Sequence, residues 1–285
     1  MIAKSIAAPR AIRPQMTRRG LLASAGIFAG VKALGLNPSP REITVLRNCP
    51  VVELRQYTLH AGGRAQLIQL FESHFIQPQE ALGIHVLGPF CDREDPNRFV
   101  WMRGFPNMAE RSRMLAAFYG GPAWQEHRNA ANATMIDSDN VLLLRPASAE
   151  SVVHAGVRSS ALALQHDSLL VATIYYVEND ASDQFASFFQ SAMLPRLVDT
   201  GANVIAVFRT EGSANNFPKL PIREKEHVLV WLAVFQSEEQ YRSQVAALRA
   251  GADWREHAPE DVLRQLARKP EVLMLTPTPH SKLGD

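Results

Sequence analysis

The chain has 285 residues, 46% of them hydrophobic and 20% charged, which is typical of a globular protein with about two domains and excludes collagen-like, coiled-coil and largely disordered classes. Two cysteines, Cys49 and Cys91, are too few for a disulfide scaffold, and no run of 18 apolar residues predicts a membrane-spanning helix. The formal net charge of +2 includes six cations within residues 1–36. Without them 24 of the 30 Lys and Arg remain against 28 Asp and Glu, so we expect no nucleic-acid partner.

Residues 1–36 resemble a twin-arginine export signal. Arg18 and Arg19 follow Thr17 and precede a weakly apolar run, rich in Gly and Ala, at residues 21–36. The resemblance implies a contact with the twin-arginine export machinery and a periplasmic or secreted location. Two alternatives stay open, a mitochondrial presequence and a disordered basic tail, because both are also basic and free of acidic residues.

The rest of the chain contains an internal repeat. Val100-Trp101 recurs as Val230-Trp231 at an offset of 130 residues, whereas Tyr57 recurs as Tyr175 at an offset of 118. The difference predicts an insertion of 12 residues in the second copy, in the Asn- and Pro-containing segment 213–221. We therefore divide the chain into a signal (1–36), a linker (37–49), repeat 1 (50–147), a linker (148–167), repeat 2 (168–278) and a tail (279–285).

Both repeats show the same order of predicted elements. In repeat 1 this is a strand at 51–59, a helix, strands at 84–90 and 99–105, a second helix and a strand at 141–146; repeat 2 has strands at 169–177, 204–208, 229–235 and 272–277. The second helices are predicted to begin at Asn107 and Ser237, which form capping boxes with Glu110 and Gln240. The β-α-β-β-α-β order is that of a ferredoxin-like unit. We predict an α+β protein in which two such units pack sheet to sheet within one chain.

The segment 52–59 (Val-Glu-Leu-Arg-Gln-Tyr-Thr-Leu), followed by Val100-Trp101 and Trp124, resembles the NIPSNAP family of dimeric α+β barrel proteins. The resemblance covers about residues 50–277 and implies an intrachain barrel. It does not imply an activity, because relatives with this barrel include cofactor-independent oxygenases, haem-binding enzymes and proteins with no known reaction. We predict no cofactor, and haem and a homo-oligomer are both left open.

Alternation along the strands predicts a group of inward-facing polar residues. Val100, Met102 and Gly104 form a uniformly apolar face, which we assign to the helices. The opposite face, assigned to the space between the two sheets, holds the candidate ligand-binding residues Glu53, Arg55, Tyr57, Trp101 and Arg103.

Repeat 2 lacks these charges, since Val171, Thr173 and Ala233 stand where repeat 1 has Glu53, Arg55 and Arg103. Buried charges must pair, reach water or hold a ligand. Two interpretations follow: an ion pair of Glu53 with Arg55 or Arg103 at a barrel mouth, or a pocket for an anionic or carbonyl-bearing small molecule.

The histidines give weaker candidates. His85 is a candidate general base if it faces inward, with Tyr57 as the other proton carrier, and His74 is expected in the core. His127 and His257 belong to the repeated Trp-x-Glu-His and would share a metal only if they met across the pseudo-twofold axis, so we predict no metal site. The hydrolase, nucleotide-binding, zinc-protease and thiol-redox motifs are absent from the sequence.

Two functions from different classes follow. The first is an exported protein that binds a small apolar or anionic molecule between the sheets. The alternative is a cofactor-independent oxygenase or isomerase acting on a small carbonyl compound, in which His85 or Tyr57 moves the proton and Arg55 or Arg103 stabilises an enolate. The first is favoured because no histidine or carboxylate has an identifiable reaction partner in the sequence.

Overall fold

The computed structural model describes residues 49–148, 168–178, 182–251 and 264–281. The predicted export signal with Arg18 and Arg19, and the second Trp-x-Glu-His with His257, lie outside these residues. Within the described part, no helix has the length and apolar character needed to cross a membrane.

Repeat 1 contains four strands and two helical regions. In chain order its elements are β1 (Val51–Leu59), α2 (Gly63–Leu70), the π-helical turn η1 (Phe71–Phe75), α3 (Ile76–Ala81), β2 (His85–Asp92), β3 (Arg98–Phe105), α4 (Met108–Gly120), α5 (Pro122–Asn132) and β4 (Met135–Pro146). The helix α5 was not predicted as a separate element. It begins where Gly121 breaks α4 and Pro122 opens a new first turn.

Repeat 2 repeats this order. Its described elements are β5 (Leu169–Tyr176), α6 (Ser182–Phe188), η3 (Phe189–Met193), α7 (Leu194–Asp199), β6 (Asn203–Thr210), β7 (Val228–Phe235), α8 (Glu238–Ala250) and β8 (Glu271–Pro277). The π turns η1 and η3 stand at equivalent positions, 118 residues apart. The predicted caps are present, because the side chains of Asn107 and Ser237 accept hydrogen bonds from the amides of Glu110 and Gln240 at 2.8 and 3.2 Å.

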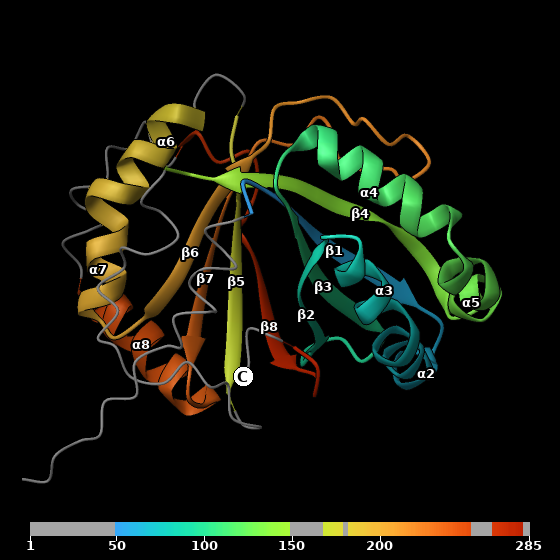
Figure 1. Ribbon diagram of the computed structural model, residues 1–285. Helices are drawn as coiled ribbons and strands as arrows, with labels where there is room; N and C mark the ends of the chain where they lie inside the picture. The colour runs from blue at the N-terminus through green and yellow to red at the C-terminus, as the bar shows by residue number, and fades with distance from the viewer. Residues whose placement is uncertain (1–48, 149–167, 179–181, 252–263, 282–285) are drawn as a thin grey trace, which may run out of the picture. The chain divides into compact units, whose positions relative to one another are not determined.

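The eight strands form one closed antiparallel barrel in the order β1-β3-β2-β8-β5-β7-β6-β4. Each repeat contributes four neighbouring strands, and the two sheets join at two short seams, β2 with β8 and β4 with β6. The helices of each repeat lie on the outside of their own sheet (Figure 1). The predicted α+β fold of two tandem ferredoxin-like units is confirmed.

Three apolar clusters show which residues of each strand point into the barrel and which point toward the helices. The cluster inside the barrel draws on both repeats and includes Val100, Met102, Leu170 and Val230. The other two clusters lie between each sheet and its own helices. Both faces of the sheets are therefore buried, as expected for a barrel covered by helices.

The predicted orientation of the strands is wrong. Val100 and Met102 point into the barrel, whereas Tyr57 and Trp101 pack with the helix residue Phe71. Glu53, Arg55 and Arg103 alternate with the barrel-facing residues and so also lie under the helices. Alternation correctly groups the residues that share a face. It does not say which of two buried faces meets the helices, and the uniformly apolar face is here the one that fills the barrel.

The two cysteines, Cys49 and Cys91, are free. β1 and β2 are both antiparallel to β3 and hence parallel to each other. Cys49, just before β1, lies against Gly104 near the end of β3. Cys91 pairs in register with Phe99 near the beginning of β3, so the two thiols lie at opposite ends of the sheet.

Candidate functional site

A buried carboxylate surrounded by three arginines lies between the sheet of repeat 1 and its helices. Glu53 and Arg103 are directly opposite on β1 and β3. Glu53 Oε2 accepts from Arg103 Nε and from Arg55 Nη1, each at 2.7 Å, and Glu53 Oε1 accepts from Arg111 Nε, also at 2.7 Å. All four side chains are at most 1% exposed. The predicted ion pair exists, but it is a cluster of four groups in the interior and not a pair at a barrel mouth.

The third arginine, Arg111, was missed by the sequence analysis. It lies in the first turn of α4 and shares a buried helix face with Leu115 and Phe118, four and seven residues further on. This spacing was a signal in the sequence that Arg111 points inward. In repeat 2 the equivalent position holds Tyr241.

The cluster carries an excess of positive charge. Burial alone would raise the pKa of Glu53, but the charges of Arg103, Arg55 and Arg111 hold it well below its usual range. One ionised carboxylate then faces three guanidinium groups, which leaves a net charge of about +2 in the interior. Arg103 Nη2 is buried without a hydrogen-bond partner among the described residues.

Two of the buried guanidinium groups contact an aromatic ring. The guanidinium carbon of Arg103 lies 4.9 Å from the centre of the Trp101 ring, and that of Arg55 lies 5.5 Å from it. Cation–π contacts of this kind stabilise buried guanidinium groups. The ring of Trp101 therefore separates the charged cluster from the space beyond it.

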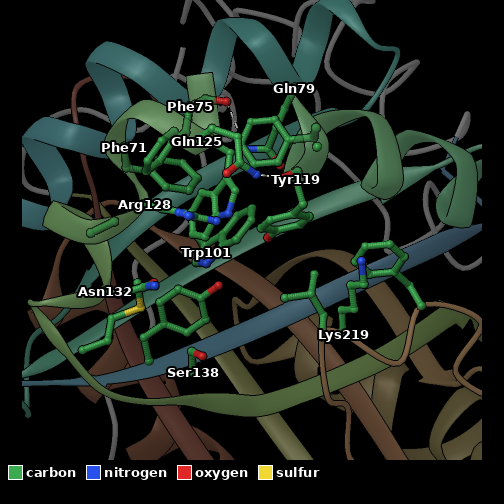
Figure 2. Close-up of a pocket in the computed structure, with 18 of the residues that line it drawn as sticks. Phe71, Phe75, Gln79, Trp101, Tyr119, Gln125, Arg128, Asn132, Ser138 and Lys219 are labelled. Atoms are coloured by element: carbon green, nitrogen blue, oxygen red, sulfur yellow. Dashed lines mark hydrogen bonds between the residues drawn. The ribbon is translucent and has the colours of Figure 1, made fainter. Parts of the chain in front are cut away.

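That space is a cavity of about 530 Å³ between the sheet and helices of repeat 1. Its walls are mainly aromatic and come from β1, β3, the helical elements and a loop of repeat 2: Tyr57, Phe71, Phe75, Trp101, Phe118, Tyr119, Trp124 and Phe217. Figure 2 shows Phe71, Phe75, Trp101 and Tyr119 around this space. The volume and the apolar lining are typical of a small-molecule site.

Three polar lining groups connect the cavity with the arginines. Arg55 Nε donates to the Tyr57 hydroxyl at 3.0 Å, and Arg103 Nη1 donates to Gln79 Oε1 at 3.0 Å and to the Tyr119 hydroxyl at 3.5 Å. A tyrosine oxygen that accepts from arginine still has its own proton to donate. Burial raises the pKa of Tyr57 despite the opposing charges of Arg55 and Arg103, so this hydroxyl stays protonated.

The mouth of the cavity is also cationic. Arg128 on α5 and Lys219 on the loop of repeat 2 line it, and both are exposed. Figure 2 shows them entering the site from different elements. The described lining contains no carboxylate and no histidine. The electrostatic potential in the cavity is therefore positive and favours a ligand that carries negative charge.

The insertion predicted in repeat 2 forms one wall of this repeat 1 cavity. Arg111 Nη1 donates to the side-chain oxygens of Asn215 and Asn216 at 3.2 and 2.8 Å, and Asn216 Nδ2 donates to the Met108 carbonyl at 2.5 Å. Phe217 of the same loop stacks on Tyr119, with 6.0 Å between ring centres. Arg111 thus contacts both the buried carboxylate and the loop that covers the cavity.

The predicted ligand-binding residues are only partly in the cavity. Tyr57 and Trp101 line it, whereas Glu53, Arg55 and Arg103 lie behind the lining and act on it through the groups they contact.

The histidines are not part of the site. Val86 packs on the helix side, so alternation places the neighbouring His85 on the barrel side of the sheet, away from Tyr57. His74, expected in the core, is half-buried and stacks on His127 at 3.8 Å between ring centres. None of these three imidazoles lines the cavity.

Few of the side chains that commonly bind a metal ion or a haem iron line the cavity among the described residues. The described residues contain no group of three or more His, Cys, Asp and Glu side chains that could bind a metal ion. The described part of the cavity lining has no histidine or cysteine, but it contains Met135, Tyr57 and Tyr119, whose residue types can also bind haem iron. Tyr57 is protonated, whereas a tyrosine ligand of haem iron is a phenolate. We derive no step through a haem.

Comparison with known proteins supports the fold. Residues 52–150 match the NIPSNAP family, in agreement with the resemblance seen in the sequence. An anthrone oxidase-like protein is similar in structure, with a TM-score of 0.56 and 11% identity over 80% of this chain and 91% of that one. No curated protein sequence matches the chain significantly.

Two further structures are similar over part or most of the chain. A candidate monooxygenase from Fusobacterium nucleatum is 9% identical over 80% of this chain and 92% of its own, with a TM-score of 0.50. An uncharacterized NIPSNAP-like domain protein from Burkholderia xenovorans is 28% identical over 34% of this chain and 84% of its own, with a TM-score of 0.31. At identities of 9% and 11%, the candidate monooxygenase and the anthrone oxidase-like protein establish the fold alone.

Proposed function

We propose that this NIPSNAP-like barrel protein binds a small aromatic molecule that carries a carbonyl or anionic oxygen, in the cavity between the sheet and helices of repeat 1. This replaces the site between the two sheets expected from the sequence, where apolar side chains fill the barrel. The aromatic walls would stack on the body of the ligand.

The contact between Arg55 and Tyr57 carries the proposal. Because the Tyr57 hydroxyl accepts from a buried guanidinium and lines the cavity, its proton is available to an oxygen of the ligand. The indole Nε1 of Trp101 is buried without a partner among the described residues and is a second donor for that oxygen. A ligand oxygen would satisfy both groups, and a negative charge on it would offset the excess charge of the arginines.

Calorimetric titration with three probes of the same shape tests this proposal. We expect 2-naphthoate to bind at least about tenfold more tightly than naphthalene, because a hydrogen bond to a charged group contributes about 1.5–3 kcal/mol. Neutral 2-naphthol should also bind more tightly than naphthalene, but by a smaller factor. Tyr57→Phe should reduce this advantage while leaving naphthalene binding unchanged. The equivalent change in repeat 2, Tyr175→Phe, is the control. Equal binding of all three probes to the wild-type protein would contradict the proposal.

The alternative function is a cofactor-independent oxygenase or isomerase acting on such a ligand. A hydroxyl donor supported by a guanidinium is the arrangement that stabilises an enolate or phenolate oxygen, which favours this reading. The described lining offers no carboxylate or imidazole to remove a proton, which favours binding without catalysis. Measuring oxygen consumption and proton exchange on carbonyl and phenolic probes would separate the two functions.

We also propose export by the twin-arginine route, on the sequence of residues 17–36. Replacing Arg18 and Arg19 with lysine should leave the precursor in the cytoplasm while the wild-type protein reaches the periplasm. Equal fractionation of the two would contradict this location and favour one of the alternatives, a mitochondrial presequence or a basic tail.

A further inference from the structure

Two arginines face each other at the seam between the repeats, away from the aromatic cavity. Arg145 on β4 and Arg209 on β6 are direct partners in this short antiparallel pair. Their neighbours Leu144 and Phe208 point into the barrel. Both arginines therefore lie on the outer face of the barrel, where α6 of repeat 2 packs.

The charges at this seam are not balanced. Like charges directly opposite each other destabilise a pair of strands. Asp183 forms an ion pair with Arg209, but the Asp183 side chain is 87% exposed. Arg145 has no ion pair with any residue that the structure describes, and the Nε atoms of both arginines are buried there without a hydrogen-bond partner.

The other seam shows that the barrel does not need these arginines. There Cys91 of β2 lies opposite Thr276 of β8. By the offsets of the repeat, these two residues stand where the first seam has Arg209 and Arg145. The pairing of β2 with β8 thus closes the barrel with two small uncharged side chains at this position. Strand pairing alone therefore does not explain the two arginines.

A cavity of about 240 Å³ lies over the arginine pair. Ser182 and His227 line it together with Arg145, Arg209 and Asp183. Thr210 is also a lining residue, but its hydroxyl is already hydrogen-bonded to the Glu226 carbonyl and the Val228 amide. The buried side-chain donors of this lining that have no partner among the described residues are the Nε atoms of Arg145 and Arg209.

We propose that this seam is a second binding site, for the oxyanion group of a small molecule, either phosphate or carboxylate. Guanidinium groups present paired N–H donors that match the oxygens of both anions. A bound oxyanion would lie between the two positive charges and supply the missing acceptors for their Nε atoms. Asp183 would compete with it for Arg209.

Titration of the full chain with inorganic phosphate and, separately, with acetate tests the site and distinguishes the two sources. We expect saturable binding of at least one anion that weakens as chloride concentration rises. Arg145→Thr combined with Arg209→Gln should weaken it at least about tenfold. Removing the same kind of charge elsewhere, by Arg249→Gln on α8, should leave it unchanged.

A second variant tests the proposal even if the double variant does not fold. Asp183→Asn removes the exposed competing carboxylate and should strengthen anion binding severalfold. Absence of saturable binding of both anions by the wild-type protein would overturn the proposal. So would unchanged affinity in the folded double variant, or weaker binding by Asp183→Asn.

Discussion

Glu53 and Arg103 lie directly opposite each other on neighbouring strands, fully buried, with 2.7 Å between Glu53 Oε2 and Arg103 Nε. At the equivalent place in repeat 2, Val171 lies opposite Ala233 in the same register. The fold is thus built once with charges and once without them. The charged cluster lies in repeat 1, directly behind the lining of the ligand-sized cavity of that repeat.

Glu53→Gln should be a severely destabilising change. It removes the only carboxylate that contacts Arg55, Arg103 and Arg111 among the described residues, and leaves three buried guanidinium groups without a counter-charge. Breaking a buried ion pair in this way costs about 3–5 kcal/mol. Urea unfolding of the variant and the wild-type protein measures the difference. A loss below about 1 kcal/mol would show that the cluster is not held by Glu53.

A quadruple variant provides the matched control for that experiment. Replacing Glu53, Arg55, Arg103 and Arg111 by Val, Thr, Ala and Tyr copies the residues of repeat 2. Because no charge is then left unpaired, most of the stability lost in Glu53→Gln should return. The variant should nevertheless lose the preference for oxygen-bearing probes, since the groups that support Tyr57 are gone.

Acid should destabilise the wild-type protein more than the quadruple variant. The folded-state pKa of Glu53 lies below its unfolded value of about 4.3, so its contribution is fully present above that pH and is lost as the pH falls toward the folded pKa. The extra slope is up to about 1.4 kcal/mol per pH unit. Unfolding free energies at pH 6, 4 and 3 measure it, and parallel pH dependences in the two proteins would contradict the assignment.

The loop of repeat 2 should control how long a ligand stays in the cavity. Asn216→Ala removes the bonds to Arg111 and to the Met108 carbonyl, so the loop is held less firmly over the site. We expect dissociation of 2-naphthoate to be about three- to tenfold faster in stopped-flow measurements. Ser213→Ala is the control, because among the described residues the Ser213 hydroxyl bonds only to Glu211 of the same loop. Identical rates in both variants would show that the loop does not close the site.

The two thiols should differ in reactivity. Cys49 is completely buried, and burial raises its pKa to about 12. Cys91 is half-buried, and burial also raises its pKa, but the charge of Arg64 opposes this effect. Cys91 should therefore react first with a disulfide reagent, and Cys49 only after unfolding. The unreduced, unfolded chain should yield two thiols. Finding none in a monomer would contradict the strand order.

The fold could be predicted from the sequence because its signals are local and occur twice. The strands repeat with their aromatic and β-branched residues, and Asn107 and Ser237 mark equivalent helix starts. The strand members of the polar cluster, Glu53, Arg55 and Arg103, also followed from alternation, since they share a face with Tyr57 and Trp101.

The location of the site depended on contacts that no local pattern records. Both faces of each sheet are buried, so the choice of face rests on tertiary packing. Arg111 and Gln79 reach the cluster from helices, and Asn216 comes from the other repeat, more than one hundred residues away in sequence. Only the helical spacing of Arg111 with Leu115 and Phe118 could have indicated one of these contacts.

Filling the cavity is the most direct test that it binds a ligand. Ala116 is an exposed lining residue of α4, and Ala246 is its exposed equivalent on α8 of repeat 2. Titration of 2-naphthoate into Ala116→Trp and Ala246→Trp compares the two positions with the same substitution. We predict that Ala116→Trp abolishes binding while Ala246→Trp binds like the wild-type protein. Equal affinities of the two variants would contradict a ligand site in the cavity of repeat 1.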